Sequence, residues 1–279
     1  MPKIGSFLPG ELLVGDWSAM PKYVTLAAMY DDDDPIVLAV DDELDSPLDR
    51  LEPADSESEP LPDPEAMLLL LASPEAAQRM QAARAFCEVA DERAVVPLIA
   101  LLDDVCPLVR VSVAYALGHN PSPHAVEPLI AQLASDWNGY VRKGLVWALG
   151  NCRDRRSLQP LLQALSTDVA AVRLWAASAL VQLIQLSYED LVMAVPPTIE
   201  ALRRDEVAAV RSNCAWTLGQ LCRELPGNVI YATAVDALLE AMVEDEDLGV
   251  QEDAKAALLR LGDPRGLQTI EELELEGLC

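Results

Sequence analysis

A segment that begins with Val-Arg recurs along this chain, and its recurrence limits the possible folds more than any other feature. The clearest copies are VRVSVAYALG from Val109, VRKGLVWALG from Val141, VRLWAASALV from Val172 and VRSNCAWTLG from Val210. A weaker copy starts at Gln78, and VQEDAKAALL starts at Val250. Their second residues, Arg79, Arg110, Arg142, Arg173, Arg211 and Gln251, lie 31, 32, 31, 38 and 40 residues apart. A period of this size is typical of stacked repeats.

A second apolar segment precedes most copies, and the pair predicts a helical hairpin. The preceding segments read AVVPLIALL, AVEPLIAQL, SLQPLLQAL and AVDALLEAM. Apolar residues recur every three to four positions in both segments, which indicates amphipathic helices, and turn residues separate them. One hairpin cannot bury its apolar face alone, so neighbours must stack. We therefore predict an all-α fold, a right-handed α-solenoid of about six hairpins. The two longer gaps predict lengthened helices and loops.

These hairpins, with VRxxAAxALG and xAVxPLIxxL at this spacing, resemble HEAT repeats from Pro64 to about Gly277. They are most similar to the short variety found in phycobilisome lyases. The resemblance implies a hydrogen-bonded ladder between an aspartate in the turn of one repeat and the arginine of the next repeat. The aspartates stand five or six residues before the arginine: Asp104, Asp136, Asp168, Asp205 and Asp245. Gln251 interrupts this ladder in the last full repeat, and the segment RGLQTIEELELEGL is expected to close that end.

Aromatic residues fall on one stripe of the Val-Arg helices. In HEAT folds these helices line the concave face, where the third, sixth and tenth residues after the initial Val should point into the groove. The stripe contains Tyr115, His119, Trp147, Asn151, Trp175, Asn213 and Trp216. Exposed aromatic rings are typical interface anchors, so these residues are the candidate partner-binding site, with Trp147 and Trp216 partly exposed. The alternative is that the rings fill gaps between adjacent helices.

The cysteines favour structural roles in most positions. Cys152 and Cys214 replace aliphatic residues of other repeats, and a buried Cys behaves as a small hydrophobe. The motif NCR at 151–153 then marks the end of a helix, with Asp154 a candidate cap for the next. Six cysteines without a CxxC pair, and no recognisable signal peptide, predict free thiols and a cytoplasmic location.

An acidic segment precedes the repeats. Residues 31–65 contain fifteen Asp or Glu and one Arg, so they contribute −14 of the net charge of −26. We expect residues 1–63 to be mostly extended or disordered and residues 64–279 to form the solenoid. Short apolar runs such as PIVLAV leave docking on the solenoid or on a partner as an alternative. The charge disfavours nucleic acid and anionic membranes, and no apolar run is long enough to span a bilayer.

No catalytic or phosphate-binding motif stands out in the sequence. His119 and His124 flank a Pro-rich turn and lack a third ligand nearby, so a solvated turn is the better interpretation. Cys279 is the last residue, and a terminal thiol is a candidate metal ligand, shared with a partner's iron–sulfur cluster, or an incidental residue. No catalytic residue is predicted, and an enzyme is the less favoured class.

Two classes of function remain open. The first is a non-catalytic adaptor that binds a protein with a basic patch in its groove. The chain resembles cyanobacterial IscA-interacting HEAT-repeat proteins, which implies an IscA-like partner, a link to iron–sulfur cluster assembly and a possible shared cluster. The second is a phycobilisome bilin lyase, a lyase subunit, or a phycobiliprotein-binding degradation factor. Bilin propionates favour basic groups, and the stripe offers few besides Arg84 and Lys143.

Overall fold

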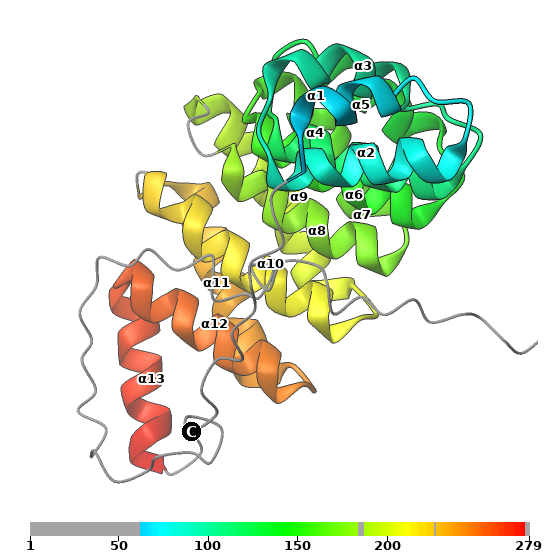
Figure 1. Cartoon of the computed structure of the whole chain (residues 1–279). Coiled ribbons are helices and arrows are strands. Elements are labelled where there is room, and N and C mark those ends of the chain that lie inside the picture. Colours follow the sequence, from blue (N-terminus) through cyan, green and yellow to red (C-terminus); the bar gives the residue numbers. More distant parts are fainter. Residues whose placement is uncertain (1–61, 184–186, 226, 277–279) are drawn as a thin grey trace, which may run out of the picture. The chain divides into compact units, whose positions relative to one another are not determined.

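The computed structural model describes residues 62–183, 187–225 and 227–276, which are entirely helical apart from turns (Figure 1). The acidic segment up to residue 61 and Cys279 lie outside the described residues. The α-helices are α1 (Pro64–Leu70), α2 (Ala76–Glu88), α3 (Val95–Ala100), α4 (Pro107–His119), α5 (Val126–Ser135), α6 (Gly139–Cys152), α7 (Leu158–Thr167), α8 (Ala170–Gln182), α9 (Tyr188–Arg204), α10 (Ala208–Leu221), α11 (Val229–Glu244), α12 (Leu248–Leu261) and α13 (Pro264–Glu276). None of the described helices is both long and apolar enough to cross a membrane.

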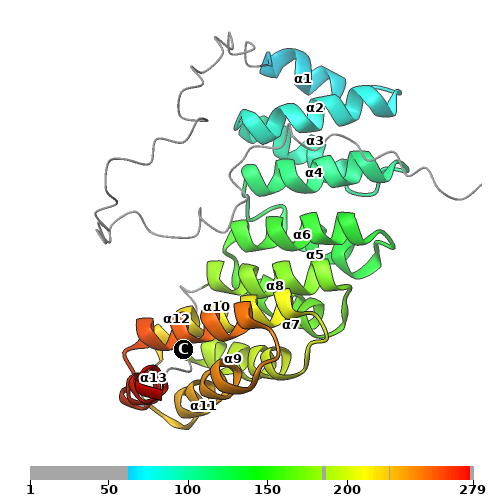
Figure 2. The ribbon, with the colours of Figure 1, turned by 90° about the horizontal axis from the view of Figure 1, so that it is seen from below.

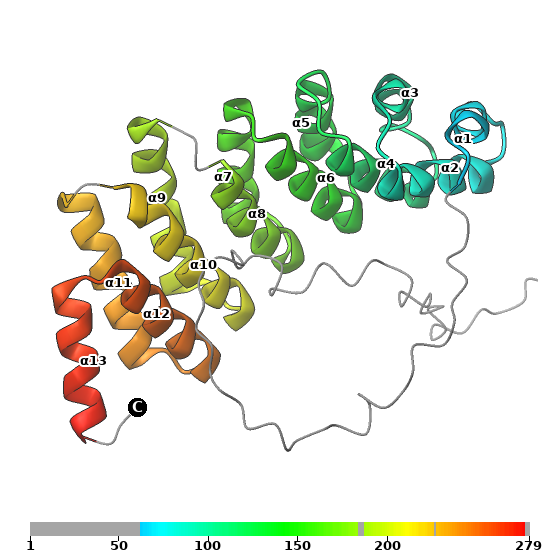
Figure 3. The ribbon, with the colours of Figure 1, turned by 60° about the vertical axis from the view of Figure 1, so that its left-hand side comes forward.

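The helices pair into six successive hairpins, from α1–α2 to α11–α12, and α13 follows the last one. Odd-numbered helices form one layer and even-numbered helices form the other (Figures 2 and 3). The predicted α-solenoid is confirmed. The two long repeat spacings correspond to longer odd-numbered helices, since α9 has 17 residues and α11 has 16. A capping box of Ser187 and Asp190 begins α9.

Small residues bring adjacent even-numbered helices close together. The ninth residue after the initial Val is glycine in three repeats, and it faces an alanine of the next even helix. A methyl group on Gly150 would lie 3.0 Å from Ala179 Cβ, and one on Gly219 would lie 2.8 Å from Ala257 Cβ. Even-numbered neighbours contact each other far more extensively than odd-numbered neighbours do. The solenoid therefore curves toward the even layer, whose open side is the concave face expected from the sequence.

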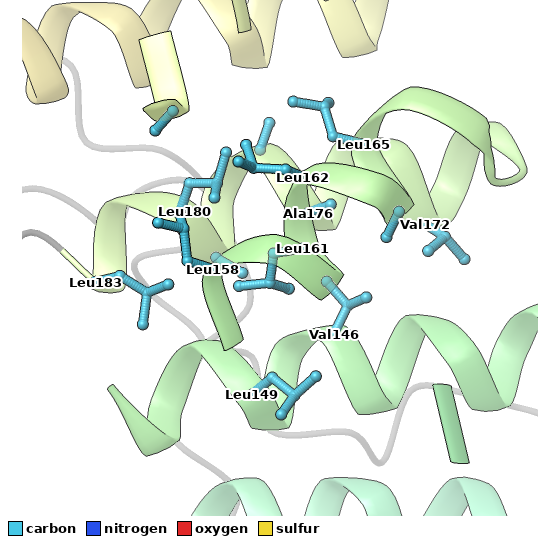
Figure 4. Close-up of a cluster of buried hydrophobic side chains, with 14 of the residues drawn as sticks. Val146, Leu149, Leu158, Leu161, Leu162, Leu165, Val172, Ala176, Leu180 and Leu183 are labelled. Atoms are coloured by element: carbon cyan, nitrogen blue, oxygen red, sulfur yellow. The ribbon is translucent and has the colours of Figure 1, made fainter. Parts of the chain in front are cut away.

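The core lies between the two layers and is almost wholly aliphatic. Figure 4 shows its middle, where Val146 and Leu149 of α6 approach Leu158 and Leu161 of α7 and Leu180 of α8. All five are buried. Leu and Ala dominate because side chains that are not branched at Cβ favour the helix while filling the space between layers. Burying one such leucine contributes roughly 1.5–3 kcal/mol.

The predicted arginine–aspartate ladder is present. Each arginine donates two hydrogen bonds to the carboxylate of the aspartate in the following repeat, at 2.6–3.1 Å. The pairs are Arg79–Asp104, Arg110–Asp136, Arg142–Asp168, Arg173–Asp205 and Arg211–Asp245. The expected direction was wrong: the carboxylate partner belongs to the repeat after the arginine. Within its own repeat, the arginine binds only a backbone carbonyl of the turn that precedes its helix, as Arg110 Nη1 does when it donates to Asp104 O at 2.8 Å.

The NCR segment ends a helix, as predicted. Helix α6 finishes at Cys152, and Arg153 takes a left-handed conformation with φ of 50°. Asp154 then accepts a hydrogen bond from the Arg156 N–H and caps the short 3₁₀ turn Arg155–Ser157. Cys214 is buried in the core, and Cys152 is half-buried against it. These structural roles account for the residues of the NCR segment without a catalytic or metal-binding role.

Candidate functional site

The open side of the even layer carries a group of ring-bearing side chains, which we call the aromatic row. Its members are Tyr115 and His119 on α4, Trp147 on α6 and Trp175 on α8. These three helices pack side by side in the even layer. Tyr115, Trp147 and Trp175 are half-buried, and His119 is exposed. The row therefore offers aromatic surface on successive repeats.

Trp147 is held in place by α4. Its ring centroid lies 5.4 Å from that of Tyr115 and 5.0 Å from that of His119, both in tilted arrangements. The indole lies over Gly118, where a methyl group would come within 2.2 Å of Trp147 Cζ3. Tilted aromatic pairs at such distances are favourable. Both interpretations of the aromatic stripe, interface anchor and gap-filling ring, therefore apply to Trp147. Its ring packs against a neighbouring helix, and part of the ring remains in solvent.

Trp175 is paired with a cation. Lys143 Nζ, on α6, lies 5.2 Å from the centre of the Trp175 ring. Burial lowers the pKa of Lys143 below its ordinary value. A cation over an indole face is attracted by the ring quadrupole. Lys143 is therefore occupied with Trp175, and of the two basic groups expected near the groove only Arg84, on α2, is exposed.

Two of the predicted partner-binding residues are buried. Trp216 on α10 is only 8% exposed, so its expected partial exposure is wrong. Asn213 is buried, and its amide donates hydrogen bonds to Leu174 O at 2.7 Å and Ser178 Oγ at 2.6 Å, which connects α10 to α8. The repeat register predicts on which side of a helix a residue lies, but it does not predict how much of the side chain the neighbouring helices cover. Asn151, at the end of α6, is half-buried.

The ladder aspartates stay ionised because of their arginines. Burial alone would raise the pKa of Asp136, but the hydrogen bonds and charge of Arg110, together with hydrogen bonds from the Asn138 N–H and Gln132, outweigh it and hold that pKa below its usual range. The same balance lowers the pKa of Asp104, Asp205 and Asp245. With each guanidinium engaged by a carboxylate, the ladder arginines are structural groups and not an anion-binding site.

The described residues offer little for nucleophilic or metal chemistry. Burial raises the pKa of the Cys87 and Cys222 thiols to about 12, and it raises the pKa of the Cys214 thiol as well. Such thiols are poor nucleophiles. Within residues 62–183, 187–225 and 227–276, no group of three His, Cys, Asp or Glu side chains is arranged to hold a metal ion. Partial desolvation lowers the pKa of His119 below its ordinary value, although the residue remains exposed.

The sequence interpretation missed two exposed aromatic residues. Trp137 is 75% exposed in the turn that leads into α6, and Tyr140, the second residue of α6, is 74% exposed. They precede the initial Val141 of the repeat, so a stripe counted within the helix leaves them out. An alignment of the repeats reveals them. Glu206 and Glu246 occupy the position of Trp137 in later repeats, and Ala171, Ala209 and Gly249 occupy the position of Tyr140.

Comparisons with known proteins agree with this architecture. The family model of HEAT repeats matches residues 64–142, 126–192 and 195–276. A search of curated proteins found no match. An engineered protein solved by crystallography is 21% identical over 72% of this chain and 97% of its own, with a TM-score of 0.55. A designed armadillo repeat protein in complex with the peptide (KR)4 is 22% identical over 71% of this chain and 98% of its own, also with a TM-score of 0.55.

These likenesses to solved structures, all below 25% identity, concern the fold alone. The family match covers both layers of every hairpin from α1 to α12. Together with the six hairpins and the arginine–aspartate ladder, it establishes that the chain belongs to the HEAT-repeat family.

Proposed function

We propose that this chain is a non-catalytic scaffold that binds a protein partner through the aromatic row. The observation that carries the proposal is the arrangement of Tyr115, His119, Trp147 and Trp175 on three adjacent helices, with rings that are fixed by packing yet open to solvent. Rigid aromatic side chains supply contact area at low entropic cost and are enriched at binding hot spots.

The charge of the chain favours a partner with a basic patch. The net charge of −26 attracts basic surfaces and repels nucleic acid and anionic membranes. The designed armadillo relative was solved with a Lys/Arg peptide, which is a property of that protein. It supports the proposal only as an example of a helical repeat protein that holds a basic segment.

The resemblance to cyanobacterial relatives suggests finer functions. An adaptor for iron–sulfur cluster assembly would bind an IscA-like protein in the cytoplasm, with Cys279 as a ligand to a shared cluster. Cys279 lies outside the described residues, so this hypothesis rests on the resemblance. The alternative, a bilin lyase or phycobiliprotein-binding factor, needs basic groups for propionates. Lys143 is engaged with Trp175, which counts against that alternative.

The scaffold proposal is tested with variants of the aromatic row. Purified wild-type chain and the variants Trp147→Ser, Trp175→Ser and Met193→Ser serve as baits, and captured proteins are identified by mass spectrometry. Met193 is an exposed apolar residue on α9, in the other layer, and provides the matched control. We expect a protein retained by wild type and Met193→Ser to be lost with both Trp variants, at a cost of about 1–3 kcal/mol by titration calorimetry. Equal retention by all four baits contradicts the proposal.

The finer hypotheses have separate tests. A chain that ends at Leu278 and the intact chain are each mixed with an iron–sulfur donor and an IscA-like protein, and visible absorbance is recorded. Equal absorbance rules out Cys279 as a ligand, while the scaffold proposal stands on the aromatic row. Addition of free bilin to the chain, followed by visible spectra, tests the lyase alternative.

A further inference from the structure

The turns before α4, α6, α10 and α12 each expose one residue because of their backbone geometry. The ladder aspartates are in extended backbone, for instance with φ −71° and ψ 126° at Asp136, so the next side chain points the opposite way. The aspartate also accepts the backbone N–H two residues on, as Asp136 does from Asn138 at 2.9 Å. The residue between them therefore forms the tip of the turn. The tip residues of these four turns are Val105, Trp137, Glu206 and Glu246. The turn at Asp168 is one residue shorter, and there the Val169 N–H itself donates to the Asp168 carboxylate at 2.7 Å.

The tip residues are apolar in the earlier repeats and acidic in the later ones. The side chains of Glu206 and Glu246 are 84% and 89% exposed, as expected for a position that faces water. Val105, by contrast, is 91% exposed, and Trp137 and Val169 are exposed as well. Since two repeats of the same chain fold with glutamate at this position, the fold does not require an apolar residue there. Solvent-exposed apolar residues grouped together mark interaction surfaces.

A second position enlarges the apolar part. Leu108 and Tyr140, in the first turn of α4 and α6, are exposed, whereas Ala171, Ala209 and Gly249 occupy this position in later repeats. Val169 continues the surface, because its Cγ2 approaches Gly139 at the start of α6. We call this surface the turn ridge: Val105, Leu108, Trp137, Tyr140 and Val169, followed by Glu206 and Glu246.

Shielding of the ladder is the structural alternative, and it does not account for the ridge. The Arg110 guanidinium lies 5.9 Å from the centre of the Trp137 ring, and Arg173 and Arg211 lie 3.6 Å from Glu206 and Glu246. Tip residues of both kinds thus contact the arginine below. Glutamate performs this task in two repeats, so it does not explain why Trp137 is aromatic, nor the exposure of Tyr140 and Leu108.

We propose that the turn ridge is a second docking surface, distinct from the aromatic row, for a protein segment with an apolar block followed or preceded by a basic block. Charge complementarity selects this occupant. The apolar block covers the ridge of the second to fourth repeats, and Lys or Arg side chains reach Glu206 and Glu246. A second copy of the chain or an anionic membrane would bring negative charge toward these glutamates and toward a chain of net charge −26.

The spacing defines a probe. Adjacent helices lie about 8–10 Å apart, so Trp137 and Glu206, two repeats apart, are separated by roughly 20 Å. An extended peptide covers this distance in about six residues. The probe is a fluorescein-labelled peptide with a Leu-Trp-Leu block and a four-arginine block joined by six Gly/Ser residues, made in both orders. Control peptides replace the arginines by glutamate or the apolar block by Gly/Ser.

Fluorescence anisotropy then measures binding to the full chain. We expect at least one order of the probe to bind, with affinity about tenfold weaker or worse in Trp137→Ser/Tyr140→Ser. Glu206→Gln/Glu246→Gln should weaken binding and reduce its salt dependence. Val229→Ser, an exposed aliphatic residue at the start of α11, is the matched control and should bind like wild type.

Folding and the aromatic row are controlled separately. Melting temperatures of the ridge variants should stay within about 3 °C of wild type, because the tips face water. Trp175→Ser, which tests the aromatic row, should leave probe affinity unchanged. Unchanged affinity in Trp137→Ser/Tyr140→Ser, no binding of either probe by wild type, or a loss caused by Trp175→Ser but not by the ridge variant would each overturn the proposal.

Discussion

The contact between Gly118 and Trp147 links packing to the proposed site through a single missing methyl group. A methyl group at residue 118 would lie 2.2 Å from Trp147 Cζ3 and 3.1 Å from Ala148 Cα. Both the ring and the neighbouring backbone must therefore move. In Gly118→Ala, we expect this overpacking, about 1–3 kcal/mol, to exceed the gain of up to about 1 kcal/mol from the higher helix propensity of alanine. Urea unfolding should show a net loss of stability.

A double-mutant cycle identifies the cause of that loss. Trp147→Leu removes the clashing ring atoms, so Gly118→Ala should cost less in the Trp147→Leu background than in wild type. Identical costs in both backgrounds would mean that Ala148, and not the indole, resists the methyl group. Either way, replacement of Gly118 changes the orientation of Trp147 relative to Tyr115 and His119, and with it the aromatic row.

At the scale of elements, the ladder fastens each hairpin to the next. The pair Arg110–Asp136 is the most enclosed, with side chains 7% and 0% exposed. Asp136 also accepts hydrogen bonds from Gln132 and from the Asn138 N–H. Removal of one member of a buried pair leaves an uncompensated charge, which typically costs about 3–5 kcal/mol. We expect Arg110→Gln to lower the free energy of unfolding by an amount in this range.

The last repeat supplies the matched control. Gln251 occupies the arginine position, and its amide donates to Asp245 O at 2.6 Å, which retains the backbone half of the interaction. Helix α13 is the last described helix, so the described chain has no next odd-to-even turn to supply a ladder aspartate. Asp263, between α12 and α13, accepts hydrogen bonds from Arg265 instead. Gln251→Arg should therefore bring no gain in urea unfolding. A gain comparable to the cost of Arg110→Gln would show that the ladder acts through the backbone carbonyl and not through the carboxylate.

At the scale of the whole molecule, the repeat pattern predicts the fold because every hairpin buries the same helix faces against its neighbours. The register of Val109, Val141 and Val210 fixes which helix face is buried, and all three are fully buried. Exposure within the groove depends instead on neighbours that the register does not specify. Trp147 and Trp216 occupy equivalent positions, yet one is half-buried over Gly118 and the other is buried. Trp137 was missed because it belongs to a turn, where helical periodicity carries no information.

The balance of charges in the whole molecule predicts a stability maximum in mild acid. From pH 7 toward about pH 5, protonation of exposed carboxylates reduces the repulsion within a chain of charge −26, so the melting temperature should rise. At lower pH the ladder has the opposite effect, because protonation of its aspartates lowers the melting temperature. Burial raises the pKa values of Asp104, Asp136, Asp205 and Asp245, but their arginines and the backbone N–H groups that they accept from together lower these values below 3.8.

A lowered folded-state pKa stabilises the fold above the unfolded value, near 3.8, and this stabilisation is lost as the pH falls below it. Melting curves by circular dichroism between pH 8 and pH 2.5 should therefore rise to a maximum and then fall steeply below about pH 4. Added salt should flatten the rise, because exposed charges are screened, and leave the steep acid limb, because enclosed pairs are screened much less. A melting temperature that stays constant from pH 4.5 down to pH 2.5 would show that the ladder carboxylates contribute no net stability.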